Sequence, residues 1–225
     1  MTNKPLLADQ ALQKLVSDYE FHTVLDIGCG DGIHSDRFTA AGKRVTGIDY
    51  RPRRAGVIEA NYLSHRFDEP FDCIWASHVL EHQPNAQVFL HKIYQDLKPG
   101  GVLAITVPPL KHEIVGGHLT LWNAGLLLYN LVVAGFDCRE ARCKQYGYNI
   151  SLITPKIAAD LPTEKMRFAN GDIEMLSRFF PSNSAVTWQQ GCSGDIAELN
   201  WEANRAVFRK RNRSLWDRLR NRRAA

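Results

Sequence analysis

Apolar positions along the first 155 residues follow two spacings, one typical of strands and one typical of helices. Short runs rich in β-branched and aromatic residues, such as 71–77, indicate buried strands, whereas apolar positions three or four apart indicate helices. The Pro-Gly-Gly sequence at 99–101 ends the helix before it. The pattern predicts, in chain order, helix 8–19, strand 22–27, helix 33–41, strand 44–48, helix 54–60, a short strand within 61–67, strand 71–77, helix 85–97 and strand 102–107.

The alternation continues beyond residue 107 and then fades. A helix is predicted at 122–134, ended by Gly135, and two strands at 137–144 and 148–154 are expected to form a closing hairpin. Strands that alternate with helices build a parallel sheet with helices on both faces. The fold class is therefore predicted as α/β, a doubly wound, mostly parallel, seven-stranded Rossmann-like sheet.

The last third of the chain has a different character. It contains Pro155, Pro162 and Pro181 but little strand pattern, which favours helices that pack on the sheet or extend from it. We therefore predict a cofactor-binding domain at 1–155 and a helical C-terminal extension with a basic tail at 156–225.

Composition narrows the class of protein. No apolar run approaches the roughly 20 residues that span a bilayer, and the N-terminus lacks the pattern of a secretory signal, so a cytoplasmic protein is expected. The five cysteines are odd in number and lack paired CxxC spacing. Reduced thiols and no metal site are the expectation.

The net charge of +4 is unevenly distributed. Residues 203–225 hold nine Arg or Lys residues against one acid, Asp217, a local balance of +8. Apolar side chains stand among these arginines at near-helical spacing, so residues 205–223 are predicted to form a basic amphipathic helix. Three uses remain open: packing on its own domain, binding an anionic membrane surface at the inner face of the membrane, or, as a weaker alternative, binding nucleic acid phosphates.

A glycine-rich turn follows the first strand, where open α/β sheets bind ligands. Gly28 and Gly30 permit a tight turn and a close backbone approach. Asp49, at the end of the second strand, is placed to accept hydrogen bonds from a ribose. Asp26 and Asp31 beside the turn would repel a pyrophosphate but suit a cofactor that carries an ammonium and a sulfonium.

At this point the chain resembles the class I S-adenosylmethionine-dependent methyltransferases. Residues 24–32 (Val-Leu-Asp-Ile-Gly-Cys-Gly-Asp-Gly) resemble their first motif and 47–50 (Gly-Ile-Asp-Tyr) their second. Residues 71–82, ending in Ser-His-Val-Leu-Glu-His, resemble the strand-four motif of the ubiquinone-type subgroup, and 97–103 complete the set. The resemblance covers roughly residues 20–155 and implies the methyltransferase version of the predicted fold.

The resemblance implies S-adenosylmethionine as the cofactor. It places the methionine portion at Asp26, Gly28 and Gly30, the ribose at Asp49, and the methyl-donor end at Ser77. The adenine is expected near Asn61 and Tyr62, although the family often has an Asp there. The full set of predicted cofactor-binding residues is Asp26, Gly28, Cys29, Gly30, Asp49, Tyr50, Asn61, Tyr62 and Ser77.

An alcohol acceptor also requires a base. Within the subgroup motif, His78 and His82 are expected to be structural or to lie near the cofactor. His118 and His112, in the loop between strand 102–107 and the next helix, are the predicted catalytic bases, with His118 favoured because Gly116 and Gly117 let it fold inward. Glu113 is a weaker candidate.

Three functions are compatible with these features. The first is O-methylation of a sugar or small-molecule hydroxyl, because residues 118–136 resemble those of methyltransferases associated with bacterial surface polysaccharides. The second is RNA methylation, favoured by the basic tail but not by the core. The third is a cofactor-binding interaction module without catalysis.

Overall fold

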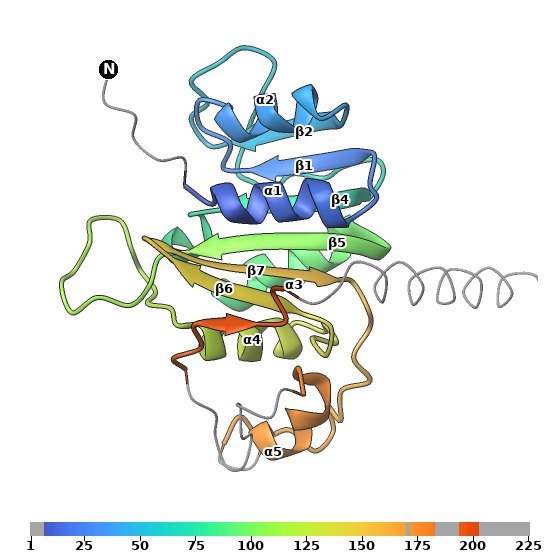
Figure 1. Ribbon diagram of the computed structural model, residues 1–225, viewed down its shortest axis with the longest axis vertical. Coiled ribbons are helices and arrows are strands. Elements are labelled where there is room, and N and C mark those ends of the chain that lie inside the picture. Colours follow the sequence, from blue (N-terminus) through green and yellow to red (C-terminus); the bar gives the residue numbers. More distant parts are fainter. Residues whose placement is uncertain (1–6, 170–171, 183–193, 203–225) are drawn as a thin grey trace, which may run out of the picture.

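An open sheet of eight strands forms the centre of the protein (Figure 1). The computed structural model describes residues 7–169, 172–182 and 194–202. The first five strands in the sheet order are parallel, and each of the last three is antiparallel to the strand before it. From one edge to the other they are β3 (Ile58–Glu59), β2 (Arg44–Asp49), β1 (Thr23–Ile27), β4 (Phe71–Ser77), β5 (Leu97–Val107), β7 (Asn149–Pro155), β6 (Arg142–Tyr146) and β8 (Glu198–Leu199).

Helices cover both faces of this sheet. The helices are α1 (Asp9–Asp18), α2 (Ile33–Ala40), α3 (Ala86–Asp96), α4 (Ala124–Val133) and α5 (Asp172–Leu176), with 3₁₀ turns η1 (Leu80–His82) and η2 (Ser177–Phe179). On β4, Trp75 packs into the core that α1 and α2 cover, while its neighbour Ile74 packs into the core that α3 and α4 cover. Successive side chains of a strand point to opposite faces. The predicted doubly wound α/β fold is therefore confirmed.

The long strand β5 begins earlier than predicted. It starts at Leu97 and includes the Pro-Gly-Gly sequence that was expected to be a loop. The amide of Gly100 donates to the carbonyl of Lys156 at 3.0 Å, and the amide of Lys156 donates to the carbonyl of Gly101 at 2.7 Å. Pairing with the segment after β7 therefore extends the strand through residues with low strand propensity.

The prediction of a helix at 54–60 is wrong. This segment forms turns and then β3, which pairs with the end of β2. The left-handed backbone of Gly56, at φ +81°, interrupts a helix here. The short strand expected within 61–67 lies at Ile58–Glu59 instead, and Asn61 begins a turn by accepting the amide of Leu63 at 3.0 Å.

Beyond β7 the described chain is less helical than predicted. Only one short helix, α5, and one 3₁₀ turn occur among the described residues after Pro155, and β8 adds an eighth strand by pairing with Cys143 and Lys144 of β6. The predicted basic helix at 205–223 lies outside the described residues. Among the helices that the structure describes, none has the length and apolar character needed to cross a membrane.

Candidate active site

The turn after β1 has backbone angles that favour glycine. Gly28, Gly30 and Gly32 have φ angles of +70°, +56° and +79°. This left-handed region is unfavourable for residues with a Cβ. The amide of Gly28 donates to the carbonyl of Ile48 at 2.8 Å, so the turn is fixed across the carboxyl ends of β1 and β2.

Asp49 holds this glycine loop in place. Its Oδ2 accepts the amide of Gly30 and its Oδ1 accepts the amide of Arg51, both at 2.8 Å. A carboxylate has about four acceptor positions, so each oxygen retains capacity for a further donor. Asp49 can thus position the loop and also accept hydroxyl groups of a ligand.

Asp26 lies beneath the loop and is 1% exposed. It accepts the hydroxyl of Ser35 at 2.6 Å. Burial raises the pKa of Asp26 to about 7, Ser35 opposes this shift, and the nearby Asp49 adds to it. A cationic ligand group at the loop would relieve the cost of this buried charge.

A cavity of about 430 Å³ opens beside the glycine loop, and we call it the loop cavity. Five of the nine predicted cofactor-binding residues line it, and four do not. Asp26, Cys29, Gly30 and Ser77 are absent from its wall. The lining residues are Ile27, Gly28, Ile48, Asp49, Tyr50, Ala60, Asn61, Tyr62, His78, Val79, His82, Gln83 and Phe89.

The predicted residues that do line the cavity contribute in different ways. The buried Tyr62 donates its hydroxyl to Asp96 at 2.9 Å, so its ring forms part of a fixed wall. The Oδ1 of Asn61 is already engaged in the turn to Leu63. Tyr50 is 68% exposed and free to cover a ligand.

Cys29 and Ser77 also lie outside the cavity wall. Burial raises the pKa of the Cys29 thiol to about 12, so Cys29 stays protonated and acts in packing against Gly47. The hydroxyl of Ser77, at the end of β4, is buried without a hydrogen-bond partner in the described part of the chain. An orphaned hydroxyl is costly, which favours a ligand contact at Ser77.

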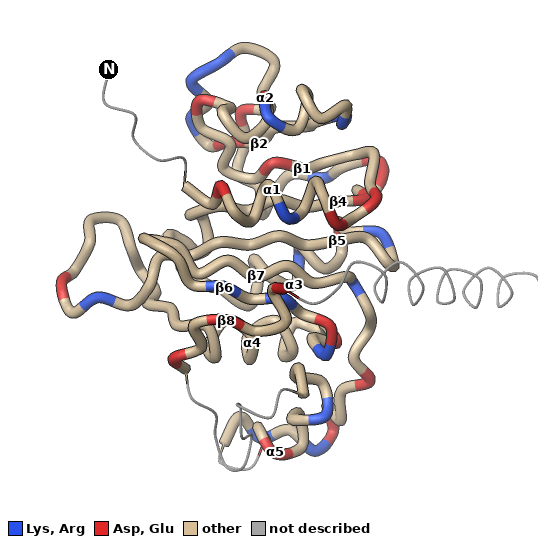
Figure 2. The backbone as a smooth tube through the Cα atoms, in the orientation of Figure 1, with Lys and Arg blue, Asp and Glu red and all other residues tan. Residues whose placement is uncertain are grey.

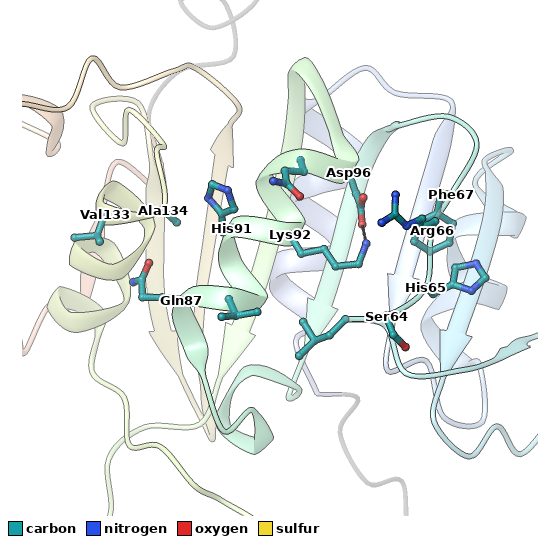
Figure 3. A pocket seen from close by; sticks show the side chains of 13 residues that line it. Ser64, His65, Arg66, Phe67, Gln87, His91, Lys92, Asp96, Val133 and Ala134 are labelled. Carbon is teal, nitrogen blue, oxygen red and sulfur yellow. Dashed lines mark hydrogen bonds and ion pairs between the residues drawn. The ribbon is translucent and has the colours of Figure 1, made fainter. Parts of the chain in front are cut away.

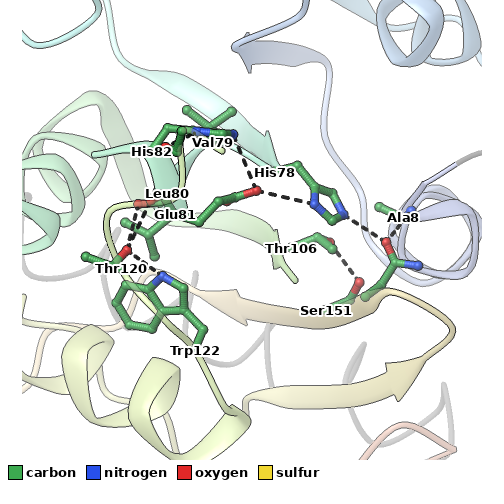
Figure 4. A network of polar contacts seen from close by, with 12 residues as sticks. Ala8, His78, Val79, Leu80, Glu81, His82, Thr106, Thr120, Trp122 and Ser151 are labelled. Atoms are coloured by element: carbon green, nitrogen blue, oxygen red, sulfur yellow. Dashed lines mark hydrogen bonds and ion pairs between the residues drawn. The ribbon is translucent and has the colours of Figure 1, made fainter. Parts of the chain in front are cut away.

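The segment after β4 contributes residues that were not in the predicted site. His78 has a left-handed φ of +55°, and its Nε2 lies 3.0 Å from Oδ1 of Asn149 (Figure 4). Its Nδ1 lies 3.3 Å from Oε1 of the buried Glu81. Burial lowers the pKa of His78, but Glu81 and Asn149 outweigh it and raise the pKa above its ordinary value. The Ser-His-x-Leu-Glu-His motif was the available signal for these residues.

The structure separates the two predicted bases. His118 is half-buried and its ring lies edge-on against His82, with centroids 4.9 Å apart. His82 lines the loop cavity. His112 is exposed on the same loop, between Lys111 and Glu113, in the loop that extends to the left of the sheet in Figure 2. Only His118 is therefore brought to the end of the loop cavity.

A larger groove of about 810 Å³ lies elsewhere, between α3 and residues 63–67 (Figure 3). Its main charged groups already pair with each other, since Lys92 contacts Asp96 at 2.9 Å. None of the predicted cofactor-binding residues lines it. The loop cavity is therefore the candidate active site.

Replacing Gly28 with alanine tests the close fit of the loop. A Cβ there would lie 2.4 Å from Cγ2 of Val79, a stiff side chain, in addition to the left-handed φ. We expect Gly28→Ala to weaken binding of S-adenosylhomocysteine by about 10-fold, roughly 1.4 kcal/mol. The matched control is Gly42→Ala, whose φ of +76° is similar but whose Cβ meets nothing within 4 Å. Equal affinities in isothermal titration calorimetry would contradict the expectation.

Comparisons with known proteins place this chain in a family. The family model described as "Methyltransferase domain" matches residues 4–168. A ubiquinone biosynthesis O-methyltransferase of Pseudomonas putida is 35% identical over 94 residues, 35% of this chain and 40% of that protein. The protein of the same name from Rickettsia canadensis is 27% identical over 131 residues, 50% of this chain and 56% of that protein. The chain thus matches only about half the length of these relatives.

Solved structures agree with the fold. The N-methyltransferase NodS of Bradyrhizobium japonicum, with S-adenosyl-L-homocysteine, has a TM-score of 0.54 at 20% identity and covers 65% of this chain and 84% of its own. A SAM-dependent methyltransferase of Archaeoglobus fulgidus has a TM-score of 0.55 at 17% identity and covers 66% of this chain and 95% of its own. The chain therefore belongs to the methyltransferase domain family, in the class I S-adenosylmethionine-dependent group.

Proposed function

We propose that this chain transfers the methyl group of S-adenosylmethionine to a hydroxyl oxygen of a small-molecule acceptor. The observation that carries the proposal is the position of His82, which lines the loop cavity and contacts His118. A cofactor bound by the glycine loop would have imidazole groups at the end of its cavity, where an acceptor hydroxyl must lose its proton. The names of the Pseudomonas and Rickettsia relatives, both O-methyltransferases, support oxygen as the accepting atom.

The cofactor positions follow from the charges and the loop. The buried carboxylate of Asp26 attracts the ammonium of the methionine portion, and Asp49 retains acceptor capacity for the ribose hydroxyls. Asn61 and Tyr62, which line the loop cavity, would border the adenine. The Ser77 hydroxyl, unpartnered in the described part of the chain, would contact the methyl-donor end. Two structural neighbours with bound S-adenosylhomocysteine, from Bradyrhizobium japonicum and Burkholderia thailandensis, support this cofactor.

The loop at 109–121 supports an acceptor with an apolar part. Four aliphatic side chains of this loop are exposed, and Ile114 is 95% exposed. Such side chains cluster in sequence around His118 and would cover apolar surface of a bound molecule. The exposed aliphatic residues are Leu110, Ile114, Leu119 and Leu121. A sugar or glycan acceptor, which the sequence suggested, has no counterpart among the named relatives and is kept as an outcome to be tested.

The reaction itself is an in-line displacement. When bound, S-adenosylmethionine would supply the methyl group, which would pass to the acceptor oxygen as the carbon–sulfur bond breaks and leave a neutral thioether. The acceptor proton leaves at the His82 and His118 end of the loop cavity. The protein mainly positions the two reactants, which accounts for a site made largely of backbone and loop contacts.

A labelling experiment tests the acceptor class. Purified protein is incubated with S-adenosylmethionine carrying a labelled methyl group and with separate fractions of apolar phenols or alcohols, lipid-linked glycan, and RNA. We expect label in the apolar hydroxyl fraction, recovered as a methyl ether by mass spectrometry. Label confined to glycan or RNA would replace the small-molecule acceptor, and cofactor binding without label in any fraction would favour an interaction module.

A further inference from the structure

Three metal-ligating side chains converge at the end of the loop cavity. Glu81 and His82 belong to η1, and His118 comes from the loop 36 residues further along. One ligand atom from each of them lies within 4.8 Å of the others. The backbone fixes this meeting, because the amides of Leu119 and Thr120 donate to the carbonyl of Glu81 at 2.8 and 3.2 Å.

Glu81 is a buried carboxylate whose charge is only partly compensated. It is 0% exposed, and neither oxygen has a hydrogen bond within the described part of the chain. Its nearest polar neighbours are Nδ1 of His78 at 3.3 Å and Nε2 of His82 at 3.9 Å (Figure 4). Removing a carboxylate from water costs several kcal/mol unless a cation or donors compensate it, which these longer contacts do only in part.

His82 is oriented as a metal ligand. Its Nδ1 lies 2.6 Å from the carbonyl of Gly117, and a carbonyl can only accept, so Nδ1 carries the proton. When the ring is neutral, the lone pair is therefore on Nε2, which is the nitrogen that faces Glu81. Metal-bound histidines commonly donate their other ring N–H to a carbonyl in this way.

Glycine allows the loop to come this close to His82. Gly117 has a φ of +80°, and a Cβ at this position would lie 3.2 Å from Nδ1 of His82. Any side chain there would be strained and would crowd the imidazole. The Gly116-Gly117 sequence thus serves both the turn and the approach of His118 to His82.

We propose that Glu81, His82 and His118 bind a divalent first-row transition cation at the end of the loop cavity, and that this cation holds the acceptor hydroxyl. Binding of the cation is independent of the proposed function, whereas its role in holding the acceptor rests on that function. Two imidazoles and one carboxylate suit Zn²⁺ or Co²⁺ better than Mg²⁺, and three protein ligands leave a position open for the acceptor.

Coordination would make the acceptor reactive. A cation lowers the pKa of a bound hydroxyl, so its proton passes to solvent water and the resulting oxyanion attacks the methyl carbon. The cation undergoes no redox change, and the charge lost by the sulfonium balances the charge of the oxyanion. Because His82 lines the loop cavity, the cation would hold this oxygen beside the methyl-donor end.

Direct binding measurements test the site without any acceptor. The full chain, freed of metal by chelation and dialysis, is titrated with Co²⁺ alone and with Zn²⁺ alone. We expect one site, with visible Co²⁺ absorption typical of nitrogen and oxygen ligands, and an affinity that falls about 100-fold in Glu81→Gln. Glu113→Gln, which changes an exposed acid on the same loop, should bind the cation as the unmodified chain does.

The alternative outcomes distinguish failure of the cation site from failure of the proposed function. Equal affinity in Glu81→Gln and the unmodified chain means that Glu81 is no ligand, and a sulfur-to-cobalt absorption band means that a cysteine binds the ion. Binding of S-adenosylhomocysteine reports whether Glu81→Gln is folded, and His118→Ala in the surface loop supplies a second test if it is not. Methyl transfer that persists in excess chelator would contradict the role of the cation and leave the proposed function intact. Cation binding without methyl transfer to any acceptor would contradict the proposed function and leave the cation site intact.

Discussion

His118→Ala is expected to lower turnover by about 100-fold or more while leaving the affinity for S-adenosylhomocysteine within about 2-fold. The reason is positional. His118 contacts His82, which lines the loop cavity, but does not itself line that cavity. Loss of the imidazole should therefore affect the proton of the acceptor and not the cofactor. Single-turnover rates with labelled cofactor, compared with calorimetric binding, separate the two effects.

His112→Ala is the matched control for this prediction. Both histidines belong to the loop 109–121, but His112 is exposed and should retain nearly full turnover. Rescue of His118→Ala by added imidazole would identify His118 as a base, whereas rescue by a higher concentration of Zn²⁺ or Co²⁺ would identify it as a ligand. Full activity in both variants would exclude the loop histidines from the reaction.

Local sequence predicted the elements whose patterns are self-contained. Strand β4 was predicted with its observed ends because seven successive residues, from Phe71, suit a strand covered on both faces. Residues 54–60 lack such a pattern. There, pairing of Ile58 with Ile48 of β2 decided the outcome, and that long-range contact has no local signature. Likewise, β8 exists because Leu199 pairs with Cys143, more than 50 residues away.

The residues of the candidate site also differ in whether local sequence predicts them. Gly28 and Asp49 were predictable because the glycine turn and the strand-ending acid carry their own geometric reasons, and both line the loop cavity. The expectation that no metal binds considered cysteine spacing alone. The convergence of Glu81 with His118 depends on how the loop 109–121 docks on η1, through backbone groups of the loop and the ring of His82, which lies 35 residues from its partner Gly117. Sequence patterns do not encode such contacts.

Asp26→Asn is expected to stabilise the free protein above neutral pH. Because the pKa of Asp26 rises from 3.8 to about 7 on folding, the folded chain holds a proton that the unfolded chain releases at lower pH. The unmodified protein should therefore lose stability as the pH rises from about 4 to about 7, by up to roughly 4 kcal/mol in total. The amide side chain of the variant has no proton to release and can still accept the Ser35 hydroxyl. Urea unfolding at pH 5 and pH 8 measures the difference.

The same substitution should weaken cofactor binding, because the amide cannot neutralise the ammonium of the methionine portion. In the unmodified protein, affinity for S-adenosylhomocysteine should rise by up to about 10-fold per pH unit below pH 7, as binding displaces the Asp26 proton. In Asp26→Asn this slope should disappear, and affinity at pH 8 should fall about 100-fold. Asp31→Asn, at an exposed position of the same loop, is the control and should retain the slope. If Asp26→Asn keeps the pH dependence of affinity, or gains no stability at pH 8, then Asp26 is ionised at neutral pH and its burial is compensated within the protein.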